Sequence, residues 1–88
     1  MPFRVSEIQP TPNPNAAKFV LDREIAATPI SFFNASAAEH HPLAKKLFAI
    51  SGVSSLLLLG DFITVNKRSD ASWKDLTPRV TRVLENEP

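Results

Sequence analysis

Two adjacent histidines, His40 and His41, are the side chains of this sequence best suited to hold a metal ion, with the carboxylate of Glu39 beside them. A metal-binding pair on a helix needs a spacing of three or four residues, which brings both imidazoles to one face. Adjacent residues point in different directions, and the sequence has no cysteine that would complete a tetrahedral site. We therefore expect solvated histidines at the start of a helix, and no metal or other cofactor.

Residues for covalent or acid–base catalysis are not arranged in a known pattern. The serines lie outside the glycine-flanked elbow that exposes a nucleophile, and there is no cysteine nucleophile. The acidic residues are spread over expected turns and helix starts, where bonding to the local backbone explains them. Gly52 and Gly60 are isolated, so no glycine-rich loop is available to hold a phosphate. The sequence predicts no catalytic residues, and a protein that is not an enzyme.

The composition fits one small domain, which we place over residues 1–88. Hydrophobic residues make up 43% of the chain, which is enough for one layered core. The net charge is +1, and the basic pairs at 45–46 and 67–68 are too scattered for a nucleic-acid-binding surface. No apolar run approaches the roughly 20 residues that cross a bilayer, and no secretory signal is visible at the start. Small secreted domains usually carry disulfides, and this sequence has no cysteine, so we expect a cytoplasmic protein. We also expect a monomer that binds neither nucleic acid nor membrane.

The most constrained segment is residues 11–16, which read Thr-Pro-Asn-Pro-Asn-Ala. Each proline fixes its own φ, removes a backbone donor and restricts the preceding residue to extended conformations, which excludes a helix. One interpretation is a hairpin corner in which Asn13 and Asn15 bond their own backbone, and such turn chemistry is common. The other is a recognition loop, because a preordered loop loses little entropy on binding.

The elements around this loop indicate a β-rich first half. Residues 3–9 and 16–22 alternate well enough to predict two strands joined by the loop as a wide hairpin. The run at 30–33 follows a proline and predicts a short third strand at a sheet edge. Residues 34–41 are small and polar, which indicates a loop.

The first predicted helix begins at Pro42, because a proline at the first helical position gives up a donor that has no partner there. Leu43, Leu47 and Ile50 then recur at intervals of four and three residues on one face. Gly52 is expected to end this helix.

The clearest local signal is the pair Gly60-Asp61 between apolar runs at 56–59 and 62–66. Glycine in the first position of a two-residue loop favours a type II′ turn, whose geometry suits the twist of antiparallel strands.

A second helix follows, with Ser72 as its cap and Asp75 three residues later. Pro78 lies about two turns in, so the helix either kinks there or restarts at Thr77-Pro78 after a short first turn. The apolar stripe of this helix comprises Trp73, Leu76, Val80, Val83 and Leu84.

The element order is then β-β-β-α-β-β-α. Hairpins imply antiparallel pairing, and two amphipathic helices bury their stripes on one face of a sheet. We expect an α+β fold with two layers, in which an antiparallel sheet of four to five strands carries two helices on one face.

Four apolar or basic residues are candidates for contacts with a ligand. Trp73 is more simply explained as core packing, because it lies in the register of the helix stripe. Phe32 and Phe33 must point to opposite faces if they lie in a strand, which leaves one of them outward. Lys18 lies in the middle of a predicted strand and is expected to be solvated.

Several motifs follow one another along the chain. They are Thr-Pro-Asn-Pro-Asn-Ala at 11–16 with Lys18-Phe19, Pro42-Leu43-Ala44, Leu47-Phe48-Ala49-Ile50, Gly52-Val53, Gly-Asp-Phe-Ile-Thr-Val at 60–65, Trp73 and Leu76-Thr77-Pro78. In this order and spacing the chain resembles the N-terminal domain of the Nfu/NifU-like iron–sulfur cluster scaffold family. The resemblance runs from Glu7 to Leu84 and covers nearly the whole chain.

In that family, a second domain with a Cys-x-x-Cys motif carries the cluster, and this chain has no cysteine. The resemblance therefore implies a stand-alone accessory module, which acts with a separately encoded scaffold or client protein in iron–sulfur cluster assembly or delivery. The family motifs that lie in turns are the ones that packing constrains least. The expected partner-binding residues are Thr11, Pro12, Asn13, Pro14, Asn15, Lys18, Gly60 and Asp61.

One segment departs from the family, because residues 22–25 replace a glycine-bearing turn with Asp-Arg-Glu-Ile. Any inherited partner surface at 22–36 is therefore in question. The alternative function is a general peptide- or small-ligand-binding module unrelated to iron–sulfur chemistry, in which the edge strand near Phe32 and Phe33 pairs with an extended peptide. A scaffold remnant without activity is a third reading.

Overall fold

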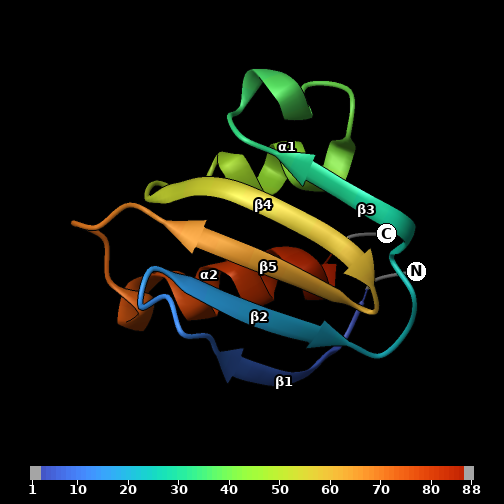
Figure 1. Ribbon diagram of the computed structural model, residues 1–88, viewed down its shortest axis with the longest axis horizontal. Coiled ribbons are helices and arrows are strands. Elements are labelled where there is room, and N and C mark those ends of the chain that lie inside the picture. The colour runs from blue at the N-terminus through green and yellow to red at the C-terminus, as the bar shows by residue number, and fades with distance from the viewer. Residues whose placement is uncertain (1–2, 87–88) are drawn as a thin grey trace.

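The computed structural model describes residues 3–86, which form a five-stranded antiparallel sheet covered on one face by two helices (Figure 1). The strands run in the spatial order β1-β2-β5-β4-β3. The elements are β1 (Val5–Pro10), β2 (Ala16–Leu21), β3 (Ala26–Phe32), the 3-10 helix η1 (Ser36–Ala38), α1 (Pro42–Phe48), β4 (Val53–Gly60), β5 (Phe62–Lys67) and α2 (Trp73–Asn86). The predicted α+β fold and the order β-β-β-α-β-β-α are confirmed.

The hydrophobic core lies between the sheet and the helices. Sheet partners share a face, and the register Phe19↔Ile63 and Leu58↔Ile63 places these three fully buried side chains toward the helices. The other large, fully buried core residues are Leu47, Leu56, Val65, Val80 and Leu84. No helix in residues 3–86 is long and apolar enough to cross a membrane.

The edge strands differ in extent from the prediction. The strand β1 begins at Val5, because the Phe3 N–H bonds the Leu84 carbonyl at 3.1 Å and so belongs to the contact with α2. The strand β3 begins at Ala26, four residues earlier than expected, because Ala26 already pairs with Gly60. Its register shifts between Ala26 and Ile30, where Pro29 cannot donate to the ladder. The position of β3 at the edge of the sheet is confirmed.

The turn between β4 and β5 has two residues, since Leu59 pairs with Phe62. Gly60 has a φ of 57°, whereas Asp61, like the other described non-glycine residues, has a negative φ. A type II′ turn needs a positive φ at its first residue and a type I′ turn at both, so the angles fit the predicted type II′ turn.

The helix α1 begins at Pro42 as predicted but ends at Phe48, four residues before Gly52. The chain continues in a turn, in which the Ile50 N–H bonds the Leu47 carbonyl at 3.1 Å. Gly52 has a φ of 104°, and a Cβ there would lie 2.9 Å from the Cβ of Ala71. Gly52 is therefore needed where the chain turns into β4, and it does not end the helix α1.

The helix α2 runs without a break from Trp73 to Asn86 and contains Pro78, so it does not restart at Pro78. Ser72 caps it as predicted, since its Oγ accepts the Lys74 N–H at 3.2 Å. The buried part of its apolar stripe comprises Leu76, Val80 and Leu84, with Trp73 and Val83 packed against the core at its edge.

Candidate protein-interaction site

The loop at 11–15 is held by its own side chains. The Asn15 N–H bonds Asn13 Oδ1 at 2.9 Å, which is the local turn chemistry expected of asparagine. The Thr11 hydroxyl lies 2.9 Å from the Asn13 carbonyl and 3.0 Å from the Ala16 carbonyl, and also accepts the Asn13 N–H at 3.2 Å. The hairpin corner is therefore confirmed for Asn13.

Asn15 does not bond its own backbone with its side chain, in contrast to the prediction. Its Oδ1 accepts from Lys67 Nζ at 2.9 Å, and its carbonyl accepts the Lys67 N–H at 2.7 Å. These bonds form because β2 pairs with β5 in a register that brings the start of one strand to the end of the other. They join the loop to a residue far away in the sequence.

Trp73 holds the loop from the side of α2. Its Nε1–H donates to the Pro14 carbonyl at 3.0 Å, while its ring centroid lies 6.4 Å from that of Phe19. The side chain is half-buried and packs against the core, as predicted, but its polar end also fixes the loop. No local pattern indicates this contact, which joins residues 59 positions apart.

Behind the loop lies a cavity of about 270 Å³ between β1, the start of β2 and the start of α2. Ile8 and Pro10 form one side of it and Trp73 another, and its lining residues include no charged side chain. Ile8 is 40% exposed, although it lies in β1 with its partner Phe19 fully buried. A preordered loop beside an apolar cavity is suited to receive an apolar side chain of a partner.

The other expected partner-binding residues do not lie at this loop. Ala16, next to the loop, pairs with Asn66, whereas Val20 pairs with Phe62 beside the turn at 60–61. Ala16 and Val20 are four residues apart in β2, so the loop and the turn lie about 14 Å apart along this strand. The Gly60-Asp61 turn instead contacts the chain after β2, since the Ile25 N–H bonds the Gly60 carbonyl at 2.7 Å. The expected residues thus do not form one continuous surface.

Lys18 lies on the sheet face opposite the helices, where its Nζ stands 4.1 Å from the centroid of the Phe62 ring. It is half-buried rather than fully solvated. The same face carries the half-buried side chains of Val20, Leu57 and Leu59. Sequence reasoning missed this apolar face, although the four consecutive leucines at 56–59 indicated it, because alternate residues of a strand point to opposite faces.

The two histidines have different environments. His40 is exposed, while His41 caps α1 by accepting the Ala44 N–H on Nδ1 at 3.1 Å. The His41 ring also packs edge-on against Phe32, with centroids 5.4 Å apart, so the expectation of a solvated residue is wrong for His41. Within residues 3–86, no group of three or more His, Cys, Asp or Glu side chains is placed to hold a metal ion.

Phe32 and Phe33 point to opposite sides as predicted, with Phe32 8% exposed and Phe33 78% exposed. The segment at 22–25, where the chain departs from the resemblance, is tied to the N-terminus. Asp22 Oδ1 accepts the Arg4 N–H at 3.1 Å, and the Arg23 guanidinium lies 4.3 Å from the centroid of the Phe3 ring.

The family of this chain follows from its similarity to known proteins. The family model described as "Scaffold protein Nfu/NifU N terminal" matches residues 5–87. The chain belongs to this family. The crystal structure of protein SAV1430 from Staphylococcus aureus superposes on this chain with a TM-score of 0.80 at 28% identity, covering 93% of this chain and 99% of that one.

Further relatives of this Nfu N-terminal domain are longer. The mitochondrial NFU1 iron–sulfur cluster scaffold homolog of Drosophila persimilis is 36% identical over 80 residues, which cover 89% of this chain and 28% of the relative. A NifU-like protein of Schizosaccharomyces pombe is 39% identical over 77 residues, covering 84% and 30%. The solution structure of a NifU-like protein from Saccharomyces cerevisiae has a TM-score of 0.81 at 27% identity, covering 96% of this chain and 76% of that one. The chain thus spans less than a third of the length of the curated relatives it matches.

Proposed function

We propose that this domain is a non-enzymatic accessory module of iron–sulfur cluster assembly or delivery, which contacts a separate scaffold or client protein. Membership of the Nfu/NifU N-terminal family supports the link to iron–sulfur clusters, since relatives are named as cluster scaffolds. The family is described as a scaffold rather than as a class of enzyme. The cytoplasmic location stays a prediction, because relatives named as mitochondrial share this domain.

The observation that carries the proposal is the fixed loop at 11–15 beside the apolar cavity. Bonds from Lys67 and Trp73 hold the loop at both of its sides, so that little further ordering is needed when a partner binds. The wall at Ile8 offers an apolar surface that water otherwise covers. A partner that inserts one apolar side chain here and bonds the exposed loop groups would use both features.

The test is an amide NMR titration of the labelled domain with a separately produced Cys-x-x-Cys scaffold domain, with and without its cluster. We expect shifts at residues 8–17 and at the Trp73 indole. Replacing Ile8→Gln removes the apolar wall and is expected to weaken binding about fivefold, which corresponds to about 1 kcal/mol of lost apolar burial. Phe33→Gln is the matched control, because it removes an exposed apolar side chain from a different surface.

The absence of shifts with either form of the scaffold domain would contradict this role. Equal weakening by Ile8→Gln and Phe33→Gln would remove the loop and its cavity from the contact.

The alternative of a peptide-binding edge at β3 has less support. Phe32 is part of the core, and the strand carries both Pro29 and an irregular register, which are devices that protect a sheet edge from pairing. A small ligand in the cavity behind the loop is the form of this alternative that the geometry favours.

A further inference from the structure

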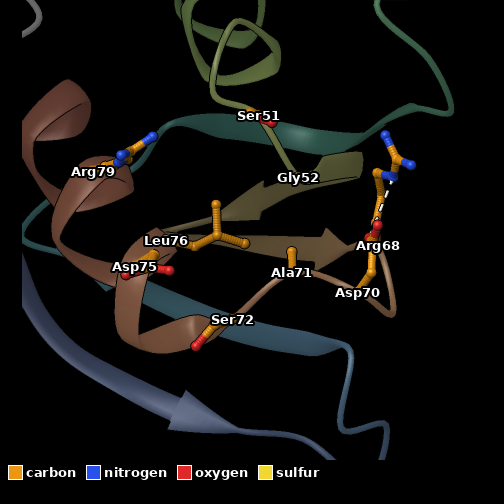
Figure 2. A pocket seen from close by; sticks show the side chains of 9 residues that line it. All are labelled: Ser51, Gly52, Arg68, Asp70, Ala71, Ser72, Asp75, Leu76 and Arg79. Atoms are coloured by element: carbon orange, nitrogen blue, oxygen red, sulfur yellow. Dashed lines mark ion pairs between the residues drawn. The ribbon is translucent and has the colours of Figure 1, made fainter.

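A second concave surface lies on the helical side of the molecule, between α2 and the segment that ends α1. One pocket of about 290 Å³ is lined by Ser51, Gly52 and Arg79 among others (Figure 2). The next pocket, of about 390 Å³, lies between Lys46 and Ala49 on one side and residues 82–86 on the other. Residues within 46–52 and within α2 line both pockets, and residues within 68–72 complete the first one. We call the residues that line the two pockets together the helix groove.

Two arginines of α2 line the helix groove, Arg79 in the first pocket and Arg82 in the second. Arg79 and Arg82 are exposed, and neither forms an ion pair with another residue in the described part of the chain. They stand three positions apart on α2, a spacing that places side chains on neighbouring positions of one helix face.

No carboxylate among residues 3–86 forms an ion pair with Arg79 or Arg82. Asp70 pairs with Arg68 at 3.5 Å, and Figure 2 shows this pair on the opposite side of the pocket from Arg79. Glu85 is directed toward β1, since its Oε2 accepts the Val5 N–H at 3.2 Å. Asp75 lines the same pocket as Arg79 and forms no ion pair with it. Arg79 and Arg82 are therefore available to bind the carboxylates of a partner.

The groove also has an apolar part, formed by the exposed Ala49 and the half-buried Val83. An apolar surface between the cations suits a protein segment better than a nucleic acid, whose binding depends on neutralising many phosphates. The chain as a whole carries a net charge of only +1, which also disfavours a polyanion.

We propose that the helix groove binds an acidic segment of a partner protein, whose carboxylates pair with Arg79 and Arg82 while an apolar side chain packs on Ala49 and Val83. Guanidinium groups suit this task, because they bond a carboxylate through two parallel N–H groups. The surface is separate from the loop at 11–15, and the proposal holds without any iron–sulfur role.

The test uses a short synthetic peptide that alternates pairs of glutamate with leucine, and a matched peptide in which glutamine replaces every glutamate. In an amide NMR titration of the full chain, the acidic peptide is expected to shift residues 46–52 and 75–86. The double variant Arg79→Gln/Arg82→Gln is expected to bind it about five times more weakly, as two partly exposed ion pairs are lost. The control Arg4→Gln/Lys74→Gln removes the same net charge outside the groove and is expected to change the affinity less than about twofold.

Several outcomes would overturn the proposal: no shifts with the acidic peptide, equal binding of the glutamine peptide, or equal weakening by the control variant. Tighter binding of a single-stranded oligothymidylate, or of vesicles containing phosphatidylserine, would assign the groove to another class of partner. A failure of the scaffold titration described above leaves this test unaffected, because none of the residues that line the two pockets of the helix groove lines the cavity behind the loop.

Discussion

Single side chains in this domain connect segments that are far apart in the sequence. Trp73 combines two roles, since its ring packs near Phe19 while its Nε1–H holds the Pro14 carbonyl. Lys67 similarly holds Asn15 through both its side chain and its backbone N–H. The loop at 11–15 is therefore fixed by tertiary contacts as well as by its prolines.

Replacing Trp73→Phe tests the polar half of that contact. The variant keeps an aromatic ring but loses the N–H donor to Pro14, so we expect the free energy of unfolding to fall by about 1 kcal/mol. Chemical denaturation measures this change, and hydrogen exchange should show faster exchange at the amides of Asn13 and Asn15. Unchanged exchange at the loop would show that its own bonds suffice to hold it.

The two glycines provide a matched pair of backbone tests. Gly52→Ala places a Cβ 2.9 Å from that of Ala71 at a φ of 104°, and we expect it to lower the free energy of unfolding by at least about 2 kcal/mol. Gly60→Ala meets nothing within 4 Å at a φ of 57°, so its expected cost is about 1 kcal/mol.

The second substitution Ala71→Gly separates the two causes at Gly52. It removes the atom that the new Cβ would meet, and should recover part of the loss in a Gly52→Ala background. If it recovers nothing, backbone strain alone explains the effect of Gly52→Ala.

At the scale of elements, the strand β4 carries leucines on both faces of the sheet. Its four leucines at 56–59 alternate between the core and the open face of the sheet, with Leu58 fully buried and Leu57 half-buried. Leucines on both faces indicate that the open face is also partly apolar, where it joins Val20 and Phe62.

We expect Leu58→Ala to lower the free energy of unfolding by about 3 kcal/mol, because it leaves a cavity in the core. Leu57→Ala removes the same atoms from the open face, and we expect a loss of about 1 kcal/mol. Thermal or chemical denaturation of the two variants measures the difference. Similar losses for both would indicate that the open face is covered in solution, for example by a second copy of the chain.

Element boundaries were predicted well where local chemistry sets them and poorly where pairing sets them. The start of α1 at Pro42 and the turn at 60–61 depend on proline and glycine angles, and both agree with the sequence. The strand β3 extends back to Ala26 because Gly60 is within reach across the sheet, which no local pattern contains. Of the two outcomes expected at Pro78, the restart does not occur, because α2 continues through this residue with its apolar stripe packed on the core.

At the scale of the whole molecule, the antiparallel pairing of β2 with β5 places the loop at 11–15 and the turn at 60–61 at opposite ends of the sheet. The turn therefore lies about 14 Å from the loop, at the margin of a contact that is centred on the loop. This separates residues that the sequence alone grouped into one surface.

The separation gives a direct prediction for partner binding. We expect Asn13→Ala to weaken binding of the scaffold domain, because it releases the Asn15 N–H from its local acceptor and loosens the loop. Asp61→Ala, an exposed change at the far end, is expected to leave the dissociation constant within about twofold. Titration calorimetry of both variants measures this, and a larger loss with Asp61→Ala would move the contact to the turn.

The sequence by itself determined the local conformations and the composition of the layers. Proline angles made the loop at 11–15 non-helical, and the spacing of apolar residues defined one buried face for each helix and strand, because these are properties of neighbouring residues. Which surfaces those elements build together depends on the tertiary structure, which places Trp73 and Ile8 around one cavity behind the loop and Arg82 and Lys46 around one pocket. Strand order and helix placement follow from the packing of the entire core, and that sum of long-range contacts is not written in any single segment.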